Sequence, residues 1–324
     1  MRPEPMRSGP MRPEPMRPEP MRPNVPSAGL AAPLMLRLPL RGEHLLALTK
    51  PGLTAMSVCT AAGGAYLAGG SDPSYFRILF LVVGTFLVGG GAVALNQFLE
   101  RAYDARMKRT ERRPLPAGLV SPLVALLLGI GMVSAGVIVL AATTNGLAAV
   151  LAMITAVTYV AVYTPLKRFS HFATAVGGVP GALPPVIGWV AVRGAITIEA
   201  YILFLLLYLW QMPHFLSLAW MYRDDYARGG YRLLPVFDQS GVTTSRLVVV
   251  YTAALIPASI LLTASGIMGS LFLYGGILAG VAFLVPSVRF VRDRSVVSAR
   301  RVFLASLVYL SVILLLMVLD RISA

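Results

Sequence analysis

The chain consists mainly of long apolar runs that are interrupted by charged residues, glycine and proline. A run of about 20 residues is long enough to cross the hydrocarbon core of a bilayer as a helix. Nine runs meet this description: 53–70, 75–98, 120–141, 145–163, 173–191, 198–217, 246–265, 268–287 and 302–319. Short turns join the third run to the fourth ("TTNG") and the seventh to the eighth ("SGIMG"), which predicts two antiparallel hairpins. The pattern therefore predicts an all-α integral membrane protein with nine transmembrane helices.

The fifth run is unusual because it contains four Gly and three Pro residues within "VGGVPGALPPVIGW", residues 176–189. In a bilayer, a break in a helix is tolerated only where the backbone faces protein or a cavity. Two interpretations follow: a broken helix that lines a substrate cavity, or close helix packing through small residues. The sequence favours neither over the other.

The composition agrees with a membrane protein, because 56% of the 324 residues are hydrophobic and only 13% are charged. The positions of Lys and Arg indicate the orientation of the nine spans. With nine spans, 25 of the 28 basic residues lie on one side of the membrane, and only Arg77, Arg193 and Arg321 lie on the other. By the positive-inside rule, the first side is cytoplasmic. The single cysteine, Cys59, excludes an internal disulfide and a cluster of thiolate metal ligands within one chain.

The first 40 residues are rich in Met, Arg, Pro and Glu and begin with repeats such as "MRPEP". Proline at this density removes amide donors and prevents helix formation, so we expect a disordered cytoplasmic tail at 1–40 and one transmembrane domain at 41–324. The tail is either solvated or bound to anionic lipid head groups. It resembles neither a signal peptide nor a mitochondrial transit peptide, so a bacterial inner membrane is the expected location. Because Met recurs in the tail, a start at Met35 is left open.

A polar segment, "NQFLERAYDARMKRTERRPLPAG" (residues 96–118), begins at the end of the second span. Asn96, Glu100 and Asp104 are spaced four residues apart in it, so on a helix they drift by only about 80° and share one face. A second polar region ends the sixth span on the same side of the membrane and contains His214, Tyr222, Asp224, Asp225 and Tyr226. The topology therefore brings two acidic regions to the cytoplasmic side.

Two acidic regions in basic surroundings suit the binding of a magnesium diphosphate, because Mg2+ prefers oxygen ligands and commonly joins one or two carboxylates to substrate phosphates. The predicted ligands, which are also the predicted catalytic residues, are Asn96, Glu100, Asp104, Asp224 and Asp225. The predicted diphosphate-binding cations are Lys108, Arg109, Arg112, Arg113, Lys167 and Arg168. The alternative interpretation is that these charges end the helices and extend to lipid head groups without binding a substrate.

Histidine occurs three times, as His44, His171 and His214. A single His near the end of a membrane helix is more often a packed residue than a metal ligand, and no paired-His motif is present. Only His214 lies in a segment with several other polar residues. We therefore predict that His214 positions a substrate.

These motifs make the chain resemble the UbiA-type intramembrane prenyltransferases from about Leu48 to the last span. Residues 96–118 are similar to the first acidic motif of the family, with matching Asn, acidic positions, "RT" and "RPLP". Residues 163–189 and 210–236 are similar to the family's loop and fifth helix and to its second polar region. Within residues 210–236, "WQMPHF" followed by "DY" and "LLP" resembles the haem branch of the family rather than the quinone branch.

Two positions depart from the family pattern. Glu100 stands where the family most often has Asp, which keeps the oxygen ligands on a side chain longer by one methylene. Ala102 stands where many relatives have another Asp, so it cannot contribute a ligand. Neither departure is expected to disable the site, and their effect on metal binding is left open.

The resemblance implies nine transmembrane helices around a central cavity, with cytoplasmic loops that cover a diphosphate. It also implies that the farnesyl group of farnesyl diphosphate and water add to a vinyl group of haem B, giving haem O and diphosphate, with Mg2+ as cofactor. His214 and Tyr226 would bind or position the haem. Haem O serves terminal oxidases, directly or after conversion to haem A, so a haem A synthase or an oxidase is a candidate partner. Lipid surrounds the protein, and nucleic acid is not an expected partner.

Two other functions fit parts of the pattern. A UbiA-type enzyme that prenylates an aromatic quinone precursor would share the first motif, but its second motif would contain regularly spaced Asp residues. A multispan transporter is suggested by the Gly- and Pro-rich fifth run, but a transporter would place ionisable residues near the membrane midplane. Here the carboxylates collect at one edge of the spans.

Overall fold

The computed structural model describes residues 41–69 and 74–322, and all the regular elements in these residues are helices. The predicted tail at 1–40 lies outside the described residues. In chain order, the elements are α1 (Gly42–Thr49), α2 (Pro51–Ala68), α3 (Tyr75–Asp104), α4 (Pro122–Thr143), α5 (Gly146–Val157), the π-helix η1 (Thr158–Tyr163), α6 (Thr164–Leu166), α7 (Ala173–Arg193), α8 (Ile198–Met221), α9 (Arg223–Arg228), α10 (Leu234–Phe237), α11 (Val242–Ala264), α12 (Ser270–Asp293) and α13 (Val296–Leu319).

Eight of the described helical segments are long and apolar enough to cross a membrane, and the pair α1 and α2 forms a ninth candidate if it is counted as one span. The pair is bent by 49° at Lys50. The bend has a local cause, because Lys50 adopts a left-handed conformation with a φ of 43° and Pro51 has no N–H with which to continue α1. The predicted all-α membrane fold is confirmed, with eight spans or, if this bent pair is counted as one span, nine.

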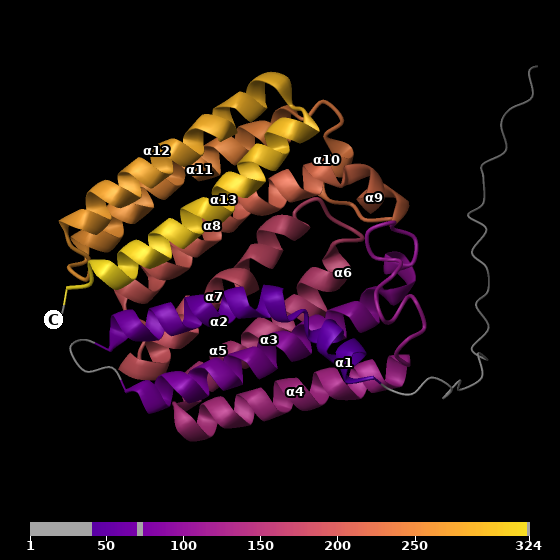
Figure 1. The fold of residues 1–324 in the computed structure, drawn as a ribbon, viewed down its shortest axis with the longest axis horizontal. Helices are drawn as coiled ribbons and strands as arrows, with labels where there is room; N and C mark the ends of the chain where they lie inside the picture. Colours follow the sequence, from indigo (N-terminus) through magenta and orange to yellow (C-terminus); the bar gives the residue numbers. More distant parts are fainter. Residues whose placement is uncertain (1–40, 70–73, 323–324) are drawn as a thin grey trace, which may run out of the picture. The chain divides into compact units, whose positions relative to one another are not determined.

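The packing of α3 against α4 depends on glycines in both helices, which lie side by side (Figure 1). A Cβ atom on Gly91 would lie 2.7 Å from the carbonyl oxygen of Gly129, and one on Gly136 would lie 2.7 Å from that of Gly84. Small residues at such positions allow the backbones of membrane helices to approach closely. This contact fixes the direction of α3, whose last turns carry part of the predicted site.

The remaining long helices form neighbouring pairs around α8. That helix packs against α7, α11 and α13, while α12 packs against α11 and α13 (Figure 1). The two hairpins predicted from short turns are confirmed, because α4 packs against α5 and α11 against α12.

The Gly- and Pro-rich segment lies in α7, which is continuous through it, so the interpretation as a broken helix is wrong. The close-packing interpretation holds instead. A Cβ atom on Gly188 would overlap the carbonyl oxygen of Ala61 in α2, and one on Gly64 of α2 would overlap the carbonyl oxygen of Pro185. The glycines therefore let α2 lie directly against α7.

Replacing Gly188 with Ala is expected to destabilise the folded protein by about 1–3 kcal/mol or more, because overpacking here meets backbone rather than a movable side chain. The measurement is thermal unfolding in detergent micelles. Gly131→Ala in α4 is the matched control, since a Cβ atom at that position has no neighbour within 4 Å. Equal losses in the two variants would contradict the packing argument.

Candidate functional site

The first group of functional side chains lies on the last turns of α3. Asn96, Glu100 and Asp104 are 2%, 4% and 1% exposed, so the face predicted from their spacing is turned inward. α3 carries them because it continues to Asp104, beyond the predicted end of the span at residue 98. Carboxylates at this depth require partners, because an unpaired charge is costly to remove from water.

Two basic side chains supply these partners. Arg113 donates a hydrogen bond of 2.7 Å to Oδ2 of Asp104, and Lys167 donates one of 2.7 Å to Oε1 of Glu100. Burial lowers the pKa of Lys167, but Tyr163 and Glu100 together raise it by more, so this pKa lies well above its usual value. The ammonium of Lys167 therefore stays charged at neutral pH. Two of the cations predicted from sequence thus directly contact the two predicted carboxylates of α3.

A π-helical turn helps to place Lys167 beside α3. At the end of η1, the hydroxyl of Thr164 donates to the carbonyl oxygen of Tyr159 over 2.8 Å and accepts from Nδ2 of Asn96 over 2.9 Å. The ammonium of Lys167 lies 4.4 Å from the ring centroid of Tyr163. π-helical turns are frequent at functional sites. The apolar pattern of residues 145–163 carries no signal that would have revealed this one.

Asp225, in α9, connects the second polar region to the first. Its carboxylate accepts hydrogen bonds from the backbone N–H groups of Lys108 (2.9 Å) and Arg109 (3.2 Å) and forms an ion pair with Arg228. Burial raises the pKa of Asp225, but Arg228 and the two backbone donors lower it by more, so the net shift is downward. By contrast, the side chain of Asp224 is 86% exposed and pairs with Arg223 at 3.7 Å. In this structure, Asp225 holds the loop after α3 in place.

Asp225→Asn is expected to loosen this loop. The amides of Lys108 and Arg109 should then exchange with deuterium about 10- to 100-fold faster at pH 7, because each loses a charge-assisted hydrogen bond. The pKa of Asp225 in the folded protein is lowered below 3.8. In the wild-type protein its stabilising effect on the loop is therefore present above about pH 3.8 and is lost as the pH falls through the pKa of the folded state. Hydrogen exchange at pH 7 measures the effect. Asp224→Asn should leave both amides unchanged, and equal exchange in wild type and Asp225→Asn would contradict the assignment.

The other predicted cations lie in the loops that follow α3 and α6. Arg168 lies 3.9 Å from the ring centroid of Tyr103 and donates to the carbonyl oxygen of Leu99 over 3.0 Å, so it is held against α3. Lys108, Arg109 and Arg112 are exposed. An open hollow brings Lys108 and Arg109 together with the second polar region, and its lining residues are Lys108, Arg109, Met221, Tyr222, Asp224, Asp225 and Arg228.

Lys50 is a further basic residue near the ion pairs that sequence reasoning missed. It stands at the corner between α1 and α2, and this corner is held against α3 because Gln97 donates to the carbonyl oxygen of Leu48 over 2.6 Å. The charges that act on its ammonium are those of the two ion pairs: Glu100, Asp104, Arg113 and Lys167. The only signal in the sequence is a single Lys directly before Pro51 at the edge of an apolar run.

The two residues predicted to contact haem lie in different surroundings. Tyr226 is next to Arg109, which donates to its hydroxyl over 3.3 Å and lies 5.6 Å from its ring centroid. His214 packs between α8 and α13, with Nδ1 at 2.8 Å from Oγ of Ser306 and its ring beside Trp210. The structure thus places Tyr226 with the charged loop and His214 among aromatic side chains.

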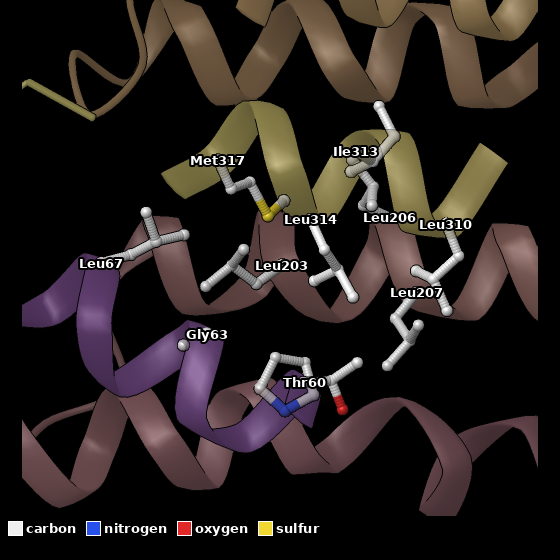
Figure 2. Close-up of a pocket in the computed structure, with 12 residues that line it drawn as sticks. Thr60, Gly63, Leu67, Leu203, Leu206, Leu207, Leu310, Ile313, Leu314 and Met317 are labelled. Atoms are coloured by element: carbon white, nitrogen blue, oxygen red, sulfur yellow. The ribbon is translucent and has the colours of Figure 1, made fainter. Parts of the chain in front are cut away.

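An apolar pocket lies between α2, α8 and α13 (Figure 2). Side chains from all three helices, including Leu67, Leu203, Leu310 and Met317, point toward one another there, and the described residues that line the pocket are all uncharged. Its residues in α2 lie at least ten positions beyond Lys50. The lining is therefore suited to hydrocarbon rather than to a charged group.

The side chains of α3 keep oxygen atoms available for a cation. Oδ1 of Asp104 is buried and has no hydrogen-bond partner among the described residues, while Arg113 binds the other oxygen. The side-chain amide nitrogen of Asn96 donates a hydrogen bond to Thr164, which leaves the side-chain carbonyl oxygen free to act as a metal ligand. Such oxygen ligands suit Mg2+. Within 41–69 and 74–322, no three His, Cys, Asp or Glu side chains are grouped to hold an ion alone, so the predicted five-residue ligand set is not assembled in this structure.

The fold and the charged site define a multi-pass helical membrane protein that gathers buried carboxylates and cations at one end of its helices. The chain belongs to the UbiA prenyltransferase family, whose sequence profile matches residues 57–313. It is therefore a prenyltransferase, as its motifs predicted, and the family assignment made from sequence is confirmed.

Several relatives are similar over nearly their whole length. The protoheme IX farnesyltransferase of Solibacter usitatus (strain Ellin6076) is 42% identical over 284 residues, which cover 85% of this chain and 97% of the relative. That of Anaeromyxobacter sp. (strain Fw109-5) is 44% identical over 274 residues, which cover 84% of this chain and 91% of the relative.

Solved structures share the fold. A digeranylgeranylglyceryl phosphate synthase has a TM-score of 0.72 at 16% identity, with 86% of this chain and 97% of that chain covered. A UbiA homologue from Archaeoglobus fulgidus bound to GPP and Mg2+ has a TM-score of 0.53 at 16% identity, with 85% and 99% covered. At such low identity these likenesses show the architecture alone.

Proposed function

We propose that the protein transfers the farnesyl group of farnesyl diphosphate to a vinyl group of haem B, with addition of water, and releases haem O and diphosphate. The observation that carries the proposal is the buried pairing of Glu100 with Lys167 and of Asp104 with Arg113, because a diphosphate and its metal ion need both charges at one place. The choice of haem as acceptor is supported by relatives of 42% and 44% identity that are named protoheme IX farnesyltransferase.

Mg2+ is the proposed cofactor, and Asn96, Glu100 and Asp104 would hold it together with phosphate oxygens. The uncoordinated Oδ1 of Asp104 supports this role. Asp224, which is exposed and lines the hollow, would be the metal ligand from the second polar region. Asp225 would reach a metal only by releasing the backbone N–H groups of Lys108 and Arg109. When bound, Mg2+ would supply positive charge to the leaving diphosphate.

The cations of the site would bind the diphosphate and stabilise it as it departs. Arg113 and Lys167 now neutralise carboxylates, and they would turn to phosphate oxygens when a metal takes over those carboxylates. Further phosphate contacts would come from the surrounding cations Lys50, Lys108, Arg109, Arg112 and Arg168. Because negative charge on the leaving group grows as the carbon–oxygen bond breaks, these contacts lower the barrier more than they stabilise the bound substrate.

The acceptor would lie deeper in the membrane, where the vinyl group attacks the farnesyl carbon that loses diphosphate. His214 and Tyr226 are the proposed haem contacts. The apolar side chains around the small pocket of Figure 2 would keep water away from an allylic cation formed near them. The active site would face the cytoplasm of a bacterium from the inner membrane, since the charged loops lie on the basic side, and a haem A synthase or a terminal oxidase would receive the product.

Mass spectrometry of extracted haems tests this function. Membranes that contain the protein, incubated with haem B, farnesyl diphosphate and Mg2+, are expected to form a hydroxyethylfarnesyl haem that is absent without the protein. No modified haem from verified folded protein would contradict the proposal, and an aromatic quinone precursor would then be the next acceptor to examine.

A further inference from the structure

The hydrogen bonds of Ser306 determine which nitrogen of His214 carries a proton. Oγ of Ser306 donates to the carbonyl oxygen of Phe303 over 2.6 Å. A hydroxyl has only one proton, so toward Nδ1 of His214, at 2.8 Å, the same oxygen accepts. The imidazole is therefore protonated on Nδ1, and Nε2 presents an unprotonated lone pair.

The ring of His214 is held in this orientation by its aromatic neighbours. It stacks on Trp210 with a centroid distance of 5.1 Å and lies 4.7 Å from the ring centroid of Phe303. Trp210 in turn donates to the carbonyl oxygen of Ser306 over 2.6 Å, which ties α8 to α13 at this level. Nε2 has no partner in the described part of the chain and is not among its fully buried, unpartnered atoms. The lone pair is thus fixed in direction and accessible.

The position of His214 along α8 matches the depth at which a prenyl group would react. His214 precedes the end of α8 at Met221 by about 10 Å, and Asn96 precedes the end of α3 at Asp104 by about 12 Å, at 1.5 Å per residue. Asp225, just after α8, binds the backbone of the loop just after α3, so the two helix ends lie near one level. A group that reacts at the level of Asn96 would therefore lie at about the depth of His214.

His214 also lies on a face of α8 that is turned toward another helix, α13. Helical periodicity places His214 on nearly the same face of α8 as Leu207, and Ser306 on a face of α13 close to that of Leu310. Leu207 and Leu310 line the inner pocket that α2 closes (Figure 2). His214 therefore lies between α8 and α13 on the pocket-lining faces of these helices, nearer to the charged end of the helices than the pocket is.

We infer that His214 is the general base for the hydration step and that Ser306 is its positioning residue, an inference that rests on the proposed haem farnesyltransferase reaction. When the vinyl group has bonded to the farnesyl carbon, a cation remains on the vinyl carbon attached to the porphyrin. The oxygen of a water molecule adds to this carbon, and one proton of that water passes to Nε2 of His214. The products are the alcohol and an imidazolium, which returns its proton to solvent.

Without the base, the cation can react in a second way, and the product differs in mass from the alcohol. Loss of a proton from the neighbouring CH2 gives an alkene that lacks one water compared with the alcohol. His214→Ala, incubated with haem B, farnesyl diphosphate and Mg2+, is expected to shift the alkene-to-alcohol ratio by about 100-fold, the typical effect of a general base. Added imidazole is expected to restore part of the alcohol. His214→Gln, which keeps much of the volume, serves as a second variant.

Ser306→Ala should move the same ratio in the same direction by a smaller factor, because the ring then loses its fixed tautomer. Ser311→Ala is the matched control: Ser311 is on the same helix, is exposed, and among the described residues its hydroxyl bonds only to the carbonyl oxygen of Leu307. A product ratio that equals that of wild type in both His214 variants overturns the inference. Loss of all product together with loss of haem binding, measured by absorbance titration, also overturns it, because His214 would then serve only to bind haem. Failure of the wild-type protein to farnesylate haem would instead contradict the proposed function.

Discussion

Asp104→Asn should reduce the rate of prenyl transfer by at least about 10²–10³-fold, the effect typical of losing one group that stabilises charge in a transition state. The substitution keeps the shape of the side chain but removes the negative charge that binds Arg113 and leaves a weaker ligand in place of the unpartnered Oδ1. The loss should therefore appear in kcat and in the Mg2+ concentration required, measured by haem O formation at saturating farnesyl diphosphate.

Glu111→Gln is the control for this experiment. Glu111 is an exposed carboxylate in the same loop and takes part in no ion pair among the described residues, so its loss changes the local charge without touching the site. Wild-type rate and Mg2+ dependence in Asp104→Asn would show that this carboxylate does not hold the metal.

Lys167→Met is expected to lower the free energy of unfolding by about 3–5 kcal/mol, because it leaves the carboxylate of Glu100 buried without its partner. The side chains of Lys167 and Glu100 are 12% and 5% exposed, so water can replace little of the lost interaction. The same variant should bind farnesyl diphosphate more weakly, since one phosphate-binding cation is missing. Thermal unfolding in detergent and the KM for farnesyl diphosphate measure the two effects.

The double variant Glu100→Gln/Lys167→Met separates stability from function. Removing both charges together avoids an unpaired buried charge, so most of the stability is expected to return, whereas activity should stay low because the metal ligand and the cation are both absent. Recovery of activity along with stability would mean that the pair is only structural.

Much of the fold follows from local properties of the sequence. The apolar runs predicted each membrane helix because a backbone in lipid must satisfy its hydrogen bonds internally. The fifth run was ambiguous because glycine and proline are compatible with both a break and close packing. The contacts of Gly64 and Gly188 with the neighbouring helix decided between them. Such a contact depends on which helix lies opposite, and the pattern of a single run does not contain that information.

In the candidate site too, the sequence predicted some features, and others depended on the tertiary structure. The spacing of Asn96, Glu100 and Asp104 determined their common face, since helical periodicity is a local property. The sequence could name Lys167 and Arg113 as cations but could not assign each to its carboxylate, because the partners come from segments joined only in the folded chain.

The sequence by itself determined the class of the protein, the spans and the chemical types of residue at the charged end, because hydropathy and helical spacing act over a few residues. Only the tertiary structure decided that Asp225 holds a loop instead of standing beside Glu100 and Asp104, that Lys50 reaches the site, and that Ser306 sets the tautomer of His214. These outcomes depend on distances between helices far apart in the chain, and a buried polar group takes whichever partner the packing brings within hydrogen-bond reach.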